Sequence, residues 1–150
     1  MKVIVATEGS DVSIEAARKC LPLLREGAAI VLVTVVPDYD DPMQMSGGFE
    51  GPLETPEEAE AAFEKSLADG WSILNQTAAD LGYSVETKVL AADTEPGLAI
   101  AKLANEIRAD LIIVGARDQG LFHRVFGGSV SDYVVHHAPC PVMVARHPSA

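Results

Sequence analysis

Five short apolar runs, separated by longer stretches with helical periodicity, constrain the fold of this chain more than any other feature. The runs are rich in β-branched residues and cover 3–6, 30–36, 85–90, 111–114 and 142–145. Parallel strands that are buried on both faces show such runs instead of polar and apolar alternation. Helical patterns fill the first four gaps, as expected when helices connect parallel strands. The sequence therefore predicts an α/β fold with a mostly parallel sheet and helices on both faces.

The chain length of 150 residues is typical of one domain, and no internal repeat or linker divides it. We therefore expect one domain over residues 1–150. The apolar runs are too short to cross a membrane, and the first run is too short for a signal peptide. We expect a soluble, cytoplasmic protein with no membrane partner. Cys20 and Cys140 suggest neither a disulfide framework nor a metal site, and we interpret both as small buried thiols.

The formal net charge of −11 argues against a nucleic-acid partner. Duplex binding depends on Lys and Arg side chains that neutralise phosphates, and acidic residues are in large excess here. The acidic residues gather in 38–41 and 54–64. We interpret both segments as solvated surface.

The helices are expected to begin at capping residues and to end at glycine or proline. The first helix is expected to run from Ser10 to Gly27, with a kink at Pro22. The second is expected to run from Thr55, which can form a capping box with Glu58, to Gly82. The third is expected to start at Glu95 and Pro96, and the fourth to run from Ser129 to His137. Trp71 belongs to or borders the apolar stripe of the second helix and is interpreted as a packing residue, not as a site that stacks on a ligand ring. The connection 37–52 has no periodicity and is interpreted as either a mobile segment or a lid.

A glycine-rich segment after the fourth apolar run carries the clearest chemical signal. It contains Gly115, Gly120, Gly127 and Gly128, and Ser129 can cap the helix that follows. Glycines let the backbone approach a ligand, and the first amides of a helix have no intrahelical acceptors, so they favour an anion such as phosphate. An ordinary glycine-rich turn would show the same spacing, and the pattern alone does not decide between the two.

Ligands of open parallel sheets bind outside the carboxyl ends of the strands, where the strand order reverses. Three segments of this chain, 6–10, 35–37 and 115–131, follow predicted strands. We expect them to meet on one rim of the sheet.

The chain resembles the universal stress protein family over essentially its whole length. The residues that carry the resemblance are the segments 3–10 (VIVATEGS), 109–115 (ADLIIVG), 128–134 (GSVSDYV) and 138–142 (APCPV). The resemblance implies an adenine nucleotide alpha-hydrolase-like fold with strand order 3-2-1-4-5 and a homodimer formed through the last strand, here 142–145. The family has branches that bind ATP and branches that do not.

ATP-binding members share the spacing Gly, two residues, Gly, nine residues, Gly, then Ser or Thr. Gly115, Gly128 and Ser129 fit this spacing, but Asp118 occupies the position of the second glycine, and Gly120 does not restore it. An aspartate adds bulk and a charge like that of phosphate. Two such charges about 4 Å apart repel by roughly 1 kcal/mol in water and roughly 4 kcal/mol near a protein surface. Pairing with Arg117, or a divalent cation such as Mg²⁺ bridging Asp118 and the phosphates, could offset the repulsion.

By resemblance, Thr7 and Val35 would flank the adenine, and Glu8 would replace the aspartate that contacts the ribose. Gly115 and Arg117 would lie near the sugar and phosphates, whereas His123 and Arg124 are interpreted as solvated surface. The full set of expected nucleotide-binding residues is Ala6, Thr7, Glu8, Val35, Val114, Gly115, Arg117, Gly128, Ser129, Val130 and Ser131.

Two functions from different classes stay open. The first is a regulatory module in the stress response that binds ATP or AMP. The alternative is a dimeric stress protein that binds no nucleotide and acts through protein contacts. An enzyme is less favoured because the chain has neither a Gly-x-Ser-x-Gly turn nor a phosphate loop with Gly-Lys-Ser/Thr, although slow ATP hydrolysis stays open. We expect no catalytic residues and no resident metal.

Overall fold

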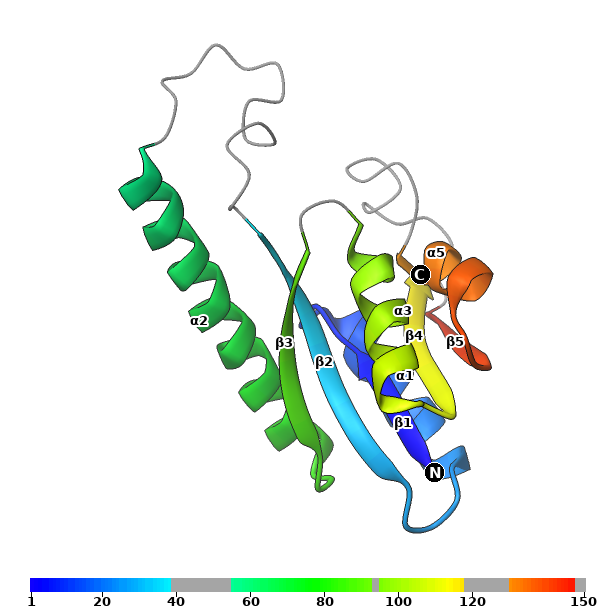
Figure 1. Ribbon diagram of the computed structural model, residues 1–150. Helices are drawn as coiled ribbons and strands as arrows, with labels where there is room; N and C mark the ends of the chain where they lie inside the picture. The colour runs from blue at the N-terminus through cyan, green and yellow to red at the C-terminus, as the bar shows by residue number, and fades with distance from the viewer. Residues whose placement is uncertain (39–54, 93–94, 118–129, 148–150) are drawn as a thin grey trace.

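The computed structural model describes residues 1–38, 55–92, 95–117 and 130–147, and its strands form one parallel sheet (Figure 1). The strand order is β3-β2-β1-β4-β5, and every neighbouring pair is parallel. The strands are β1 (Lys2–Ala6), β2 (Ala29–Pro37), β3 (Glu86–Ala92), β4 (Leu111–Arg117) and β5 (Val142–His147). The predicted fold class and strand order are confirmed.

Helices cover both faces of this sheet, as predicted. Helices α1 (Asp11–Cys20) and α2 (Pro56–Leu81) pack on one face, which we call the α1 face. Helices α3 (Pro96–Ile107) and α5 (Val130–His137) pack on the other, which we call the α3 face. Successive side chains of a strand point to opposite faces, so Val3 and Val5 join the core of the α1 face while Ile4 joins that of the α3 face.

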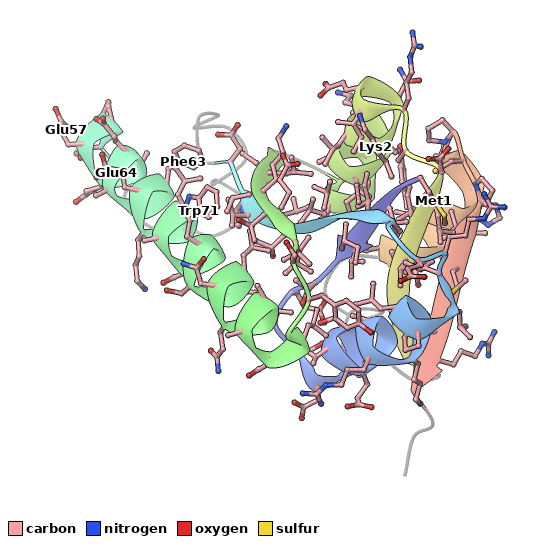
Figure 2. The ribbon with its side chains drawn as sticks, turned by 90° about the horizontal axis from the view of Figure 1, so that it is seen from below. Met1, Lys2, Glu57, Phe63, Glu64 and Trp71 are labelled. Carbon is pink, nitrogen blue, oxygen red and sulfur yellow. The ribbon has the colours of Figure 1, made fainter. Side chains whose placement is uncertain are left out.

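Helix α2 begins and ends where the sequence predicts. The Thr55 amide donates to Glu58 Oε2 at 2.8 Å, the Glu58 amide donates to Thr55 Oγ1 at 3.2 Å, and Gly82 ends the helix with a φ of 69°. The first turns of α2, which carry the labelled Glu57 and Phe63, reach past the carboxyl ends of β2 and β3 (Figures 1 and 2). Trp71 is 44% exposed, so it borders the packed stripe and is not part of the core.

The predicted carboxyl end of the first helix is wrong. Ser10 caps α1 as expected, but the helix ends at Cys20 instead of continuing through a kink to Gly27. A short 3₁₀ turn follows, η1 (Leu21–Leu23), with Pro22 near its start. Proline lacks the amide hydrogen that an α-helix needs and fits the first turn of a new element, so it ends α1 instead of bending it. Gly27 lies in the turn before β2, with a φ of 82°.

The remaining boundaries differ little from those predicted. Helix α3 starts after Glu95, β3 extends to Ala92, and β5 extends to His147. Helix α5 is described from Val130 onward, so the expected cap Ser129 lies outside the described residues, as does most of the connection 37–52. None of the helices described is long and apolar enough to span a bilayer.

Candidate functional site

The structure brings the described strand ends of the predicted binding segments together at the carboxyl edge of the sheet. The Thr7 amide donates to the Val33 carbonyl at 2.9 Å, which extends the pairing of β1 with β2 beyond Ala6. In the register of β1 with β4, Val5 pairs with Ile113, so Thr7 lies level with Gly115. In Figure 1 these strand ends lie along the upper edge of the sheet. The rim predicted from the sequence is therefore present.

Four of the predicted residues form an apolar patch on the α3 face of this rim. Val114 is buried, and Ala6, Val35 and Val130 are partly buried against the same hydrophobic cluster. Val114 comes from β4, Ala6 from β1 and Val35 from β2, and Val130 is the first described residue of α5. Segments that are far apart in sequence thus supply one apolar surface at the rim.

The Thr7 side chain points the other way, toward the α1 face. It is 4% exposed, and its Oγ1 lies 2.9 Å from Ser13 Oγ of α1. Only the backbone of Thr7 can therefore face a ligand at the rim. The next residue, Glu8, is exposed, and its carboxylate accepts a hydrogen bond from the Ser10 hydroxyl. The loop after β1 thus presents one carboxylate to the rim.

Ser10 and Ser13 contribute to this loop in a way that the sequence analysis missed. Ser13 is 2% exposed, and its hydroxyl contacts Thr7 and donates to the Ser10 carbonyl at 2.9 Å. The Ser10 hydroxyl accepts from the Ser13 amide at 3.3 Å. The signal was the regular spacing of Thr7, Ser10 and Ser13, which places three hydroxyl groups around the first turn of a helix.

Gly115 leaves room for the close packing of α1 on the sheet. A Cβ atom there would lie 3.1 Å from the Val12 carbonyl oxygen and 3.2 Å from the Ala16 Cβ of α1. The space of the missing side chain is therefore filled by the first turns of α1. A side chain at residue 115 would therefore push α1 away from β4.

The phosphate end of the predicted site is described in part. Val130 and Ser131 begin α5, and Ser131 is buried. Arg117 is the last residue of β4. Asp118, His123, Arg124, Gly128 and Ser129 lie outside the described residues.

A separate hollow of about 200 Å³ lies beside the predicted site, between the end of β3 and α3. Its lining includes Leu90, Leu98 and Lys102 but none of the residues expected to bind nucleotide. Among residues 1–38, 55–92, 95–117 and 130–147, no group of three His, Cys, Asp or Glu side chains could hold a metal ion. Cys20 is buried and Cys140 half-buried, and burial raises the pKa of both thiols, so both are poor nucleophiles at neutral pH.

Comparison with known proteins agrees with this geometry. The model of the universal stress protein family matches residues 1–146. Universal stress protein MJ0531 of Methanocaldococcus jannaschii is 31% identical over 152 residues, covering 98% of this chain and 82% of the relative. The structure of universal stress protein UspA from Lactobacillus plantarum has a TM-score of 0.70 at 25% identity and covers 97% of both chains. A universal stress protein solved in complex with cAMP has a TM-score of 0.64 at 24% identity, over 99% of this chain and 98% of that one. The chain therefore belongs to the universal stress protein family.

Proposed function

We propose that this protein is a regulatory module that binds an adenine nucleotide, ATP or AMP, at the rim formed by β1, β2, β4 and α5. The observation that supports the proposal is that β1, β2 and β4 end side by side, and that Val35 and Val130 pack against the same apolar cluster although they are far apart in sequence. Solved universal stress proteins of the same fold carry cAMP, AMP and dAMP. Those ligands share an adenine base, a sugar and a phosphate, and we propose that the rim binds these three groups.

Each part of the rim suits one part of the nucleotide. The apolar patch of Ala6, Val35, Val114 and Val130 suits the adenine ring. The Glu8 carboxylate suits the sugar hydroxyls as a hydrogen-bond acceptor. The first amides of α5 point away from the helix body and favour the negative charge of phosphate. Arg117, Gly128 and Ser129 complete the phosphate end of this proposal.

The proposal predicts measurable binding by the purified protein. Mass spectrometry of small molecules released on denaturation is expected to detect an adenine nucleotide, and calorimetry is expected to give saturable binding of ATP or AMP. Glu8→Ala is expected to weaken binding by roughly tenfold to a hundredfold, because hydrogen bonds to charged groups contribute about 1.5–3 kcal/mol. Asp80→Ala, at the other end of α2, removes an exposed carboxylate and serves as the control. No binding at millimolar nucleotide would reject the proposal.

The same titrations address the role of Mg²⁺ and of catalysis. If a divalent cation bridges Asp118 and the phosphates, ATP affinity increases when Mg²⁺ is added. We propose binding and not turnover as the function, and slow ATP hydrolysis is measured as phosphate released over hours.

The alternative function is that of a dimeric stress protein without nucleotide. The replacement of a glycine by Asp118 favours it, because a carboxylate there would repel phosphate. In that case partner proteins, and not a nucleotide, would carry the regulatory signal.

We also propose that the protein forms a homodimer through β5, at the edge of the sheet. Val144 is 37% exposed there. The Ile112 amide donates to the Pro141 carbonyl, so in a parallel ladder the amide of Val144 faces away from β4. An exposed edge of this kind favours pairing with a second copy.

Val144→Pro tests the dimer. Proline removes an outward amide without removing a hydrogen bond to β4, so it is expected to shift sedimentation from dimer to monomer at micromolar concentration while the circular dichroism spectrum is retained. Ala29→Pro is no suitable control because the Ala29 amide is bonded, whereas Val144→Thr keeps the amide and is expected to stay dimeric. A wild-type protein that sediments as a monomer would contradict the proposed dimer.

We place the protein in the cytoplasm. Its two cysteines, Cys20 and Cys140, are both free thiols, as is usual in a reducing compartment.

A further inference from the structure

We infer that Ser13 is a positioning residue for the nucleotide site, acting through the Thr7 hydroxyl to hold the loop that carries Glu8. The inference rests on the proposed nucleotide-binding function. Its basis is a chain of hydrogen bonds that joins the end of β1, the loop and the first turn of α1. Ser13 itself is buried at 2% exposure, so it acts on a ligand at the rim only through its neighbours.

The number of hydroxyl protons determines which group donates in each of these hydrogen bonds. The Ser13 hydroxyl has a single hydrogen, which it donates to the Ser10 carbonyl at 2.9 Å. In the contact of 2.9 Å between Thr7 Oγ1 and Ser13 Oγ, Thr7 must therefore be the donor. Thr7 Oγ1 in turn accepts the Gly9 amide hydrogen at 3.0 Å. The chain thus runs from the Gly9 amide through Thr7 and Ser13 to the Ser10 carbonyl.

The Ser10 side chain completes the arrangement. Its hydroxyl donates to the Glu8 carboxylate and accepts the Ser13 amide at 3.3 Å. Since both serine protons are used, the contact of 3.4 Å between Ser10 Oγ and Ser13 Oγ is packing and not a further bond. One oxygen of the exposed Glu8 carboxylate is therefore tied back to the loop, and a sugar hydroxyl at the rim would bind the other.

The loop is also confined from the side of α2. Gly9 has a φ of 83°, and a Cβ atom on it would lie 3.1 Å from Ile73 Cγ2. Ile73 thus lies against Gly9, whose amide donates to Thr7 Oγ1. Glu8, with one methylene more than the aspartate it replaces, depends on such a fixed backbone to place its carboxylate. Losing the Ser13 hydroxyl leaves the buried Thr7 proton without its acceptor and releases this anchor.

The test compares sugar recognition in wild type, Ser13→Ala and Thr7→Val. Calorimetry measures affinity for ATP, 2′-deoxy-ATP and 3′-deoxy-ATP, because a sugar hydroxyl bound by Glu8 makes at least one deoxy analogue bind more weakly. Ser13→Ala is expected to weaken ATP binding by about tenfold and to remove most of the preference for ATP over that analogue. Thr7→Val keeps the shape of Thr7 and breaks the same series of hydrogen bonds, so it is expected to show the same loss of affinity and of preference as Ser13→Ala. Ser72→Ala, an exposed serine on α2, is the control.

Hydrogen exchange of the Gly9 amide in the nucleotide-free protein gives a second readout. It is expected to be at least tenfold faster in Ser13→Ala and Thr7→Val than in wild type, and it detects the loss of the anchor even if one variant is too unstable for calorimetry. Unchanged Gly9 exchange, or an unchanged preference between ATP and its deoxy analogues, overturns the role of Ser13. If the wild-type protein binds no nucleotide, the proposed function is rejected, and with it the role of Ser13 in nucleotide binding.

Discussion

Asp118→Gly is expected to raise the affinity for ATP by one to three orders of magnitude. In the proposed site the substitution would restore the glycine spacing that the family resemblance implies for ATP binding, and it would remove both a side chain and a negative charge expected to face the phosphates. Repulsion between two charges about 4 Å apart amounts to roughly 1 kcal/mol in water and roughly 4 kcal/mol near a protein surface. Each 1.4 kcal/mol corresponds to about a tenfold change in affinity. Calorimetric titration of the variant and the wild type with ATP measures the difference.

Asp118→Asn separates the two contributions, since it keeps the bulk and removes the charge. If charge dominates, Asn recovers most of the gain at low ionic strength, and added salt reduces the difference between Asp and Asn. Binding that appears only in Asp118→Gly assigns the native chain to the branch without nucleotide. Equal affinities of wild type, Asn and Gly variants would mean that residue 118 does not face the phosphates at all. Weaker binding by the variants would show that Asp118 helps, as expected for a carboxylate that holds Mg²⁺.

Most of the fold could be predicted from the sequence because buried parallel strands leave a strong local signal. The runs that include Val3, Ile30 and Leu111 are apolar and β-branched, and the capping box at Thr55 marks the start of α2 by local chemistry alone. The end of α1 could not be predicted as easily. Pro22 fits both a kinked helix and a new 3₁₀ turn, and the local sequence does not decide between them.

The candidate site was predictable in its location but not in its internal contacts. The carboxyl edge of the sheet follows from the parallel topology. The direction of the Thr7 side chain also follows from alternation, because Thr7 continues the series of Val3 and Val5. The hydrogen-bond partner of the Thr7 side chain does not follow from alternation, since it depends on which helix covers that face of the sheet. Gly115 shows the same limit, because the sequence marks a close approach without saying whether a ligand or α1 makes it.

Helix α5 is tied to the rest of the fold through a second glycine, Gly97 of α3. A Cβ atom at Gly97 would lie 2.7 Å from Cδ1, 2.8 Å from Cβ and 2.9 Å from Cγ of Tyr133. Tyr133 in turn stacks on His137, with ring centroids 4.0 Å apart, and its carbonyl lies 2.9 Å from His137 Nδ1. One of these atoms is the Tyr133 Cβ, which rotation of the ring cannot move, so an added atom at Gly97 presses on α5 itself.

Gly97→Ala is accordingly expected to lower the free energy of unfolding by about 1–2 kcal/mol. Overpacking of this kind typically costs about 1–3 kcal/mol, and the better helix propensity of alanine returns up to about 1 kcal/mol. Urea unfolding followed by circular dichroism measures the difference. Tyr133→Ala removes two of the three close contacts, so Gly97→Ala is expected to destabilise that background less than the wild type.

The same substitution connects stability to the proposed function. Val130 and Ser131, at the start of α5, are expected to contact the nucleotide, so a displaced α5 is expected to bind ATP more weakly than the loss of stability alone explains. Calorimetry at a temperature where the variant is fully folded separates the two effects. If Gly97→Ala is as stable as the wild type and binds equally well, then α3 and α5 are less tightly coupled than the contact with Tyr133 indicates. If it is destabilised but binds ATP with wild-type affinity, the coupling stands and the first turn of α5 does not contribute to binding.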